Sequence, residues 1–290
     1  MELATIRTAG GTCAAVRSAD RWLPLGAPHL SALLAAGDWR TTAEAALAGT
    51  SPGAGVAGDA EGVPVGEAEL ALPLPAPAKV ICCGLNYADH ITEMGRDLPE
   101  HPTLFAKFAD TLTGPTDEIA VPPAAQGELD WEAELAVVVG AELRSAGEEE
   151  ARAGIAGYML ANDISVRDWQ KRTLQWLQGK AWDATTPLGP VLVTADSIDP
   201  EAGIGITCEV NGDRRQNGNT KTLVFSAAAL VAYVSQFTVL RPGDVILTGT
   251  PGGVGMGMQP PQYLSHGDTV VVEAEGLGRL ANTIRFSTAH

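Results

Sequence analysis

Residues 130–140 read DWEAELAVVVG, and this stretch decides the fold. Its second half, residues 135–139, is an uninterrupted apolar run of strand length, which is typical of a strand buried on both faces. Because alternate strand residues point to the same face, Glu132 and Glu134 are predicted to project side by side. Two such carboxylates either lie on a solvated strand edge or bind a hard divalent cation, and the spacing alone leaves both interpretations open.

Short apolar segments bounded by turn residues surround this stretch and predict a β-rich α+β domain with little βαβ alternation. The dipeptide Asn211-Gly212 is the strongest hairpin signal in the chain. The expected strands are residues 79–83, 134–140, 206–210, 244–248 and 268–273, and the expected helices are residues 148–157 and 226–236.

The N-terminal quarter of the chain differs in composition from the rest. A hairpin is expected around Gly10 and Gly11, and a short helix over residues 29–36. Residues 50–78 are rich in Gly, Ala and Pro, and the alternating prolines of residues 72–77 exclude a central strand or a helix. We therefore expect two domains, a small variable one over residues 1–75 and a catalytic one over residues 76–290.

Composition limits the classes of partner. The 290 residues include 19 Lys and Arg against 35 Asp and Glu, giving a net charge of −16. An acidic surface repels phosphate backbones and anionic membranes, so neither nucleic acid nor a membrane is an expected partner. The 45% hydrophobic content excludes disorder. The four cysteines form no CxxC pair, and no apolar leader opens the chain, so a cytoplasmic protein with reduced thiols is expected.

A cation held by Glu132 and Glu134 needs a third oxygen ligand. Asp163 follows the apolar residues 155–161 and is expected to be more buried than most acidic residues here. Asp168 and Asp183 are alternatives that the spacing does not exclude. Asp163 also fits a helix N-cap ahead of residues 165–167, which is a common role for Asp.

Residues 84–93 read GLNYADHITE and contain a candidate catalytic pair. If the chain is helical after Gly84, His90 and Glu93 lie at i and i+3 on one helix face. A carboxylate beside an imidazole raises its basicity, as deprotonation of water requires. The alternative is an ordinary exposed His–Glu pair.

Two further segments carry possible binding groups. Lys180 stands among Gly, Ala and Trp, where it either stabilises developing negative charge or extends to solvent. Closely spaced glycines over residues 249–255 present backbone N–H groups that hold a carboxylate or phosphate, or else form a tight turn.

Together these segments resemble the fumarylacetoacetate hydrolase family, in its bacterial acylpyruvase-like, diketo-acid-cleaving branch. They occur in the family's order and cover the chain from residue 79 onward. The resemblance implies a mixed β-roll with flanking helices, usually assembled as a homodimer. The matching stretches are GLNYADHITEM (84–94), PTLFAKF (102–108), DWEAELAVVVG (130–140), GYMLANDISVRDWQ (157–170), GKAWDATTPLGP (179–190), VNGDRRQNGNT (210–220) and LTGTPGGVG (247–255).

The resemblance also implies a role for each candidate residue. Glu132, Glu134 and Asp163 would bind a divalent metal, usually Mg²⁺, with Mn²⁺ as the alternative and Ca²⁺ expected in crystals; this displaces the capping interpretation of Asp163. His90 and Glu93 would activate water on a lid over the substrate. The remaining roles are oxyanion stabilisation by Lys180 and substrate contact by Lys107, Arg167, Gln170 and Thr250.

The implied function is hydrolysis of a C–C bond in a small β-diketo acid of the acylpyruvate or fumarylpyruvate type. Leu85 departs from the Arg that acylpyruvases often have at its position, which affects the expected substrate rather than the chemistry. The alternatives use the same metal site as an oxaloacetate-type decarboxylase or a 2-hydroxydienoate isomerase. A non-catalytic binding protein on the same fold is disfavoured, because every implied catalytic residue is present.

Overall fold

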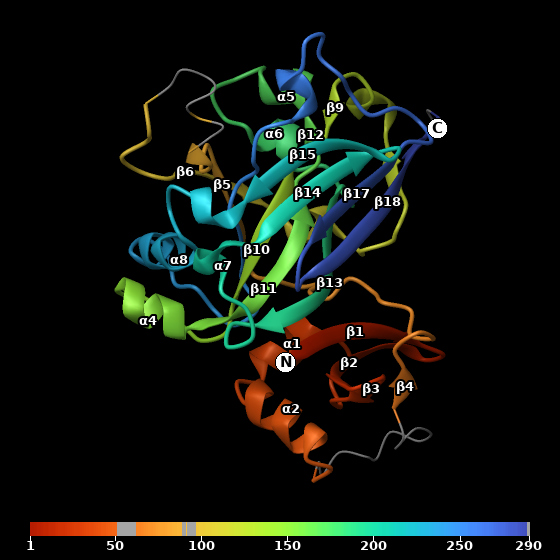
Figure 1. Cartoon of the computed structure of the whole chain (residues 1–290), viewed down its shortest axis with the longest axis vertical. Helices are drawn as coiled ribbons and strands as arrows, with labels where there is room; N and C mark the ends of the chain where they lie inside the picture. The colour runs from red at the N-terminus through yellow and green to blue at the C-terminus, as the bar shows by residue number, and fades with distance from the viewer. Residues whose placement is uncertain (51–61, 89–90, 92–96, 289–290) are drawn as a thin grey trace.

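The computed structural model describes residues 1–50, 62–88, 91 and 97–288. It shows the β-rich α+β fold expected from the sequence, with short helices around two sheets (Figure 1). Among these described residues, no helix is long and apolar enough to cross a bilayer.

The larger sheet has eleven strands and is mixed. Strand β7 (Leu112–Thr113) joins β13 in parallel, β16 and β5 are also parallel, and the other pairs are antiparallel. In spatial order the strands of the main path are β4 (Val63–Pro64), β3 (Arg21–Pro24), β2 (Gly11–Ser18), β1 (Glu2–Thr8), β13 (Thr186–Thr194), β11 (Ile155–Asn162), β10 (Ala133–Val139), β16 (Val245–Leu247), β5 (Val80–Gly84) and β6 (Thr103–Lys107).

A second sheet of five strands covers one face of β10, β11 and β13 (Figure 1). Its order is β15 (Asp213–Asn219), β14 (Gly205–Val210), β17 (Thr269–Ala274), β18 (Gly278–Phe286) and β8 (Ile119–Val121). A separate two-stranded ladder joins β9 (Leu129–Asp130) to β12 (Ser165–Val166), directly beside the start of β10.

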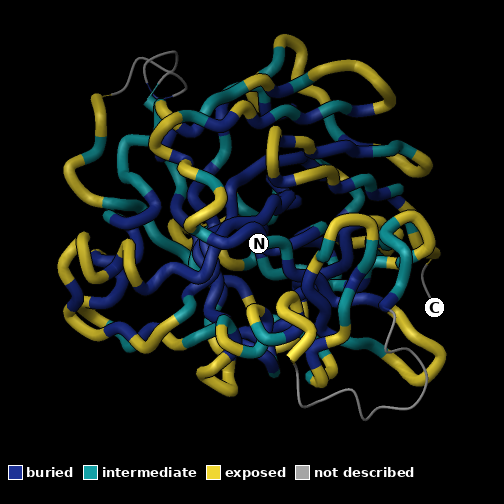
Figure 2. Tube along the Cα trace, turned by 60° about the horizontal axis from the view of Figure 1, so that its bottom comes forward, coloured by how far each residue is buried: buried dark blue, intermediate teal, exposed yellow. Residues whose placement is uncertain are grey.

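Strand β10 is buried on both faces, which explains its unbroken apolar run. Leu135 and Val137 belong to the core shared with the second sheet, whereas Ala136 and Val138 face the core that contains the N-terminal helices. Figure 2 shows this buried interior surrounded by exposed loops. The hydrophobic effect therefore fixes the register of β10, because a shift by one residue would exchange its two faces.

The helices are short and lie around the sheets. Helix α8 is capped by Ser226, whose hydroxyl accepts a hydrogen bond from the N–H of Ala229. The helices are α1 (Leu30–Ala35), α2 (Trp39–Leu47), α4 (Glu148–Ala153), α5 (Arg167–Gln170), α6 (Leu177–Lys180), α7 (Pro200–Gly203) and α8 (Ala227–Ser235).

All five predicted strands are present, each within one residue of its expected ends. The hairpin at Asn211-Gly212 is confirmed, with φ of 54° and 85° at its two turn residues. The predicted helix over residues 148–157 is too long, because it ends at Ala153 and β11 begins at Ile155, which pairs with Val139. Pairing with β10 thus outweighs local helix preference. Helix α2 was not predicted.

The N-terminal strands belong to the same sheet as the rest of the chain. Strand β1 pairs with β13, placing Glu2 opposite Val193 and Leu3 opposite Leu192. The division into domains at residue 75 stays a prediction, and the larger sheet runs across that boundary.

Candidate metal centre

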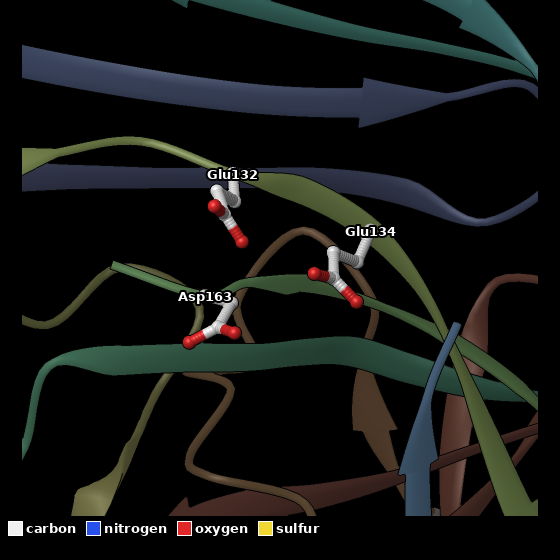
Figure 3. Close-up of side chains that lie close together, drawn as sticks. All are labelled: Glu132, Glu134 and Asp163. Atoms are coloured by element: carbon white, nitrogen blue, oxygen red, sulfur yellow. The ribbon is translucent and has the colours of Figure 1, made fainter. Parts of the chain in front are cut away.

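Glu132, Glu134 and Asp163 converge where β10 and β11 meet (Figure 3). One carboxylate oxygen from each lies within 4.8 Å of the others, and all three side chains are buried. The register that pairs Ala133 with Asn162 sets this arrangement. It is reinforced by the N–H of Asp163, which donates to the carbonyl oxygen of Glu132 at 2.8 Å.

The alternative roles of the aspartates do not match their surroundings. Helix α5 has Val166 at its N-cap position, without a side-chain cap, so Asp163 does not cap it. Asp183 is exposed, and Asp168 forms an ion pair with Arg172. Among the residues that the structure describes, Asp163 is therefore the aspartate that completes the cluster.

Two buried lysines flank Asp163. The Nζ of Lys180 lies 2.9 Å from Oδ2 of Asp163 and 2.7 Å from Oε2 of Glu132, and the Nζ of Lys107 lies 2.5 Å from Oδ1 of Asp163. The Lys180 ammonium also lies 5.1 Å from the centre of the Phe105 ring. Lys180 thus does not extend to solvent.

The carboxylates decide the protonation of Lys180. Burial alone would lower its pKa, but the charges of Asp163 and Glu132 outweigh burial and raise the pKa to about 12. For Asp163, burial opposes ionisation, and the charges of Lys107 and Lys180 still hold its pKa below the ordinary value. Lys180 is therefore a cation at neutral pH, suited to stabilising negative charge rather than to acting as a base.

Glu134 has a different environment. Its Oε2 accepts a hydrogen bond of 2.7 Å from the N–H of Gly249, and no ion pair to it exists among the described residues. Burial, followed by the charges of Asp163 and Glu132, raises its pKa well above that of an ordinary glutamate. A buried carboxylate pointing at two others, without its own cation, fits a hard divalent metal such as Mg²⁺ or Mn²⁺.

The balance of buried charge supports the same fit. With every carboxylate ionised, four carboxylates and three cations around the cluster give 3 − 4 = −1, and a divalent ion changes this sum to +1, which favours an anionic ligand. The groups counted are Asp130, Glu132, Glu134 and Asp163 against Lys107, Arg167 and Lys180.

A cavity of about 680 Å³ opens beside these carboxylates. Its apolar wall includes Leu85, whose φ of 55° is unusual for a branched side chain. Of the residues predicted from the sequence, those that line the cavity are Glu132, Glu134, Arg167, Gln170, Lys180 and Thr250.

The other predicted residues have different surroundings. Lys107 is not among the lining residues and contacts Asp163. Thr250 lines the cavity, and its hydroxyl donates to the carbonyl oxygen of Ala133. His90 and Glu93 lie outside the described residues, so their roles stay predictions.

The glycine-rich segment binds carboxylates of the chain itself. The N–H of Gly249 donates to Glu134, and the N–H groups of Gly255 and Met256 donate to Asp130. Asp130 was not predicted as a site residue. The alternation of acids at positions 130, 132 and 134 is the sequence signal that would have indicated it.

Comparisons with known proteins relate this geometry to a family. Residues 79–285 match the family model described as fumarylacetoacetate (FAA) hydrolase C-terminal. The mitochondrial oxaloacetate tautomerase fahd2 of Xenopus laevis is 48% identical over 217 residues, covering 74% of this chain and 68% of that protein.

Solved structures agree along nearly the whole chain. Maleylpyruvate hydrolase from Sphingobium sp. SYK-6, crystallised with manganese(II) and pyruvate, has a TM-score of 0.79 at 28% identity, covering 99% of this chain and 100% of that one. The 2-hydroxyhepta-2,4-diene-1,7-dioate isomerase from Mycobacterium marinum has a TM-score of 0.77 at 29% identity, with 100% of both chains covered.

Proposed function

Because the chain belongs to the fumarylacetoacetate hydrolase family, whose members include tautomerases, isomerases and hydrolases, we propose that it is a divalent-metal-dependent tautomerase of a small 2-oxo dicarboxylic acid. Oxaloacetate is the reference substrate. The observation that carries this proposal is the convergence of three buried carboxylates beside a protonated Lys180. Such a site stabilises the negative oxygen that forms when a 2-oxo acid loses a proton from C3.

The relatives favour tautomerisation over C–C hydrolysis. The oxaloacetate tautomerase of Xenopus laevis is 48% identical over 217 residues, and the maleylpyruvate hydrolase is 28% identical over 99% of this chain. Interconversion of enol and keto forms needs only a stabilised oxygen and a group that moves one proton. It is the simplest reaction that the buried charges support.

Each group of the site has a separate task in this proposal. A divalent ion held by Glu132, Glu134 and Asp163 would supply Lewis-acid polarisation of the 2-oxo group. The buried Lys180 ammonium stabilises the developing oxyanion. The side-chain oxygen of Gln170 accepts a 3.0 Å hydrogen bond from Nη1 of Arg167, which leaves the Gln170 NH₂ group as a donor for a substrate carboxylate.

The proton transfer is assigned to His90, oriented by Glu93. In the keto-to-enol direction the C3–H bond breaks, His90 takes the proton, and protonation of the 2-oxygen completes the enol. No water is consumed and no carbon bond is broken. The reverse sequence returns the keto form.

Hydrolysis of an acylpyruvate or fumarylpyruvate is the second candidate. The sequence GLNYADHITE supports it, because a His–Glu pair also suits the activation of water. The same site would serve decarboxylation of oxaloacetate or isomerisation of a 2-hydroxydienoate, both of which pass through similar negative charge on oxygen.

Product analysis distinguishes these reactions. The metal-stripped protein is incubated with oxaloacetate and separately with acetylpyruvate, each with and without Mg²⁺ or Mn²⁺. We expect metal-dependent equilibration of enol- and keto-oxaloacetate with total oxaloacetate conserved. Metal-dependent release of acetate and pyruvate without tautomerisation would instead support the hydrolase, and carbon dioxide with pyruvate would support the decarboxylase.

A further inference from the structure

Asp130 is a fully buried carboxylate with a complete set of hydrogen bonds. Its Oδ1 accepts from the N–H groups of Trp131 at 2.8 Å and Gly255 at 2.7 Å. Its Oδ2 accepts from Nε of Arg167 at 2.8 Å and from the N–H of Met256 at 3.0 Å. Four donors on one buried group fix its position and those of the elements that supply the donors.

The hydrogen bond from Arg167 connects Asp130 to the metal centre. Pairing of β9 with β12 places Ser165 opposite Asp130, and Arg167 follows at the start of α5. The guanidinium of Arg167 then lies 2.7 Å, through Nη2, from Oε1 of Glu132. Asp130 therefore orients the cation that in turn orients a proposed metal ligand, as outer partners of metal sites commonly do.

The hydrogen bonds from Gly255 and Met256 connect Asp130 to the cavity wall. Residues 253–258 supply five of the cavity-lining residues, and Asp130 holds this segment through two successive N–H groups. The approach is close enough that a Cβ at Gly255 would lie 2.8 Å from Oδ1 of Asp130 and 2.0 Å from the carbonyl oxygen of Gln262. Glycine at position 255 thus allows the contact.

We propose that Asp130 is a positioning residue that couples the metal centre to the substrate-facing segment 253–258. It acts on the metal through Arg167 and Glu132, and on the substrate through the N–H groups of Gly255 and Met256. The inference rests on the proposed metal-dependent function and extends it to a residue outside the ligand set.

The variant Asp130→Asn tests this coupling with little change in volume. Each carboxylate oxygen faces two N–H donors, so either orientation of the amide places an NH₂ group against donors. Arg167 also loses one of its two carboxylate partners and pairs more strongly with Glu132. We expect Mn²⁺ affinity to fall about 10- to 100-fold, in the range typical for outer partners of metal ligands. We also expect faster amide hydrogen exchange over residues 253–258 and a higher KM for oxaloacetate at saturating Mn²⁺.

Asp244→Asn is the matched control. Asp244 is equally buried and accepts hydrogen bonds from the N–H groups of Lys79 and Arg241, yet it does not line the cavity. Its variant should lower the melting temperature while leaving Mn²⁺ affinity and exchange over residues 253–258 as in the wild type. Equal losses of Mn²⁺ affinity in both variants would overturn the coupling in favour of general destabilisation.

Arg167→Lys keeps the test decisive if Asp130→Asn does not fold. It preserves the charge but removes the planar group that joins Asp130 to Glu132. We expect weaker Mn²⁺ binding, and an effect that is less than additive with Asp130→Asn where both fold. Wild-type affinity in Arg167→Lys would overturn the proposed path.

Calorimetric titration with Mn²⁺ separates this inference from the function on which it rests. If the wild-type protein binds no Mn²⁺, the proposed function and the inference fail together. If it binds Mn²⁺ and Asp130→Asn binds equally well, only the role of Asp130 is wrong.

Discussion

At the scale of single residues, the site is controlled by the unequal environments of its carboxylates. Asp163 contacts two lysine ammonium groups, whereas Glu134 receives one backbone N–H from Gly249. A buried carboxylate costs free energy unless it is paired, so Glu134 destabilises the metal-free fold whenever it is ionised. Stability alone therefore does not account for an ionisable group at this position.

Glu134→Gln should separate stability from metal binding. The amide keeps an oxygen for the N–H of Gly249 and removes the buried charge, so the metal-free variant should melt at or above the wild-type temperature. Mn²⁺ affinity should fall by more than the roughly 10- to 100-fold typical of outer partners, because a ligand is lost. Calorimetric titration measures the Mn²⁺ affinity, and thermal melting measures the stability of the metal-free variant. A lower melting temperature with unchanged Mn²⁺ affinity would contradict both expectations.

The sign of the pH effect on stability follows from the raised pKa of Glu134. Between the ordinary glutamate pKa and this raised value, the folded state binds more protons than the unfolded chain, so stability falls as pH rises. The difference in melting temperature between metal-free Glu134→Gln and the metal-free wild type should therefore depend on pH. It should be larger at about pH 8 than at about pH 4, which is close to the ordinary glutamate pKa. A constant difference across this range would argue against the buried charge as its cause.

Metal binding should also depend on pH through Glu134. Below its raised pKa the metal-free protein carries a proton on this group, which an incoming Mn²⁺ must displace. We expect Mn²⁺ affinity to increase with pH until that pKa is passed, with release of about one proton per ion bound. Titration calorimetry in buffers of different ionisation enthalpy measures this proton, and pH-independent affinity would show that Glu134 binds the metal from an already ionised state.

At the scale of elements, the start of β10 is held by side chains where the strand ladder ends. Pairing with β16 extends only to Ala136 opposite Leu247. Beyond that point Oε1 of Gln216, on β15, accepts from the N–H of Ala133, while Nε2 of Gln216 donates to the hydroxyl of Thr250 and to the carbonyl oxygen of Pro251. The second sheet thus fixes the backbone between the two glutamates.

Gln216→Leu should expose the importance of this contact. It leaves the buried N–H of Ala133 without an acceptor, which costs about 1–3 kcal/mol of unfolding free energy. It should also weaken Mn²⁺ binding, because Glu132 and Glu134 flank Ala133. Urea unfolding measures the first effect, with Asn217→Leu as the control, since Asn217 is exposed on the same strand. Equal stability of the two variants would contradict the assignment.

Local patterns and distant contacts differ in how well the sequence predicts them. The alternation around Glu132 and Glu134 gave their common face correctly, because strand period is a local property. Alternation also places Asp130 on this face, but its partner Gly255 lies 125 residues away, and Gln216 was missed because its partner Ala133 lies 83 residues away. The role of Asp163 came from the family resemblance, since its local pattern by itself favours a helix cap.

At the scale of the whole molecule, the N-terminal strands complete the sheet on which the site is built. Strand β1 covers the edge of β13, and Leu3 and Leu34 share a buried core with Leu192 and Ala161. Residue Ala161 directly precedes the segment that carries Asp163. The N-terminal segment therefore supports the site without supplying any of its proposed ligands.

A chain of residues 79–290 tests this dependence. Removal of β1 turns β13 into an open edge and exposes apolar side chains, which favours aggregation. We expect loss of cooperative unfolding and of monodisperse behaviour on size-exclusion chromatography. A soluble truncated chain with the wild-type melting temperature would show that residues 79–290 fold independently. Sedimentation of the full chain tests the predicted homodimer.

The most direct test of metal-dependent enolisation is the rate of ultraviolet absorbance decay of enol-oxaloacetate. It is measured for the metal-stripped wild type, Glu134→Gln and the exposed control Glu142→Gln, each with and without Mn²⁺. We expect Mn²⁺ to restore rapid ketonisation in the wild type and in Glu142→Gln but not in Glu134→Gln. A rate equal to the uncatalysed one in the Mn²⁺-loaded wild type, or equal acceleration in all three proteins, would contradict a tautomerase built on these carboxylates.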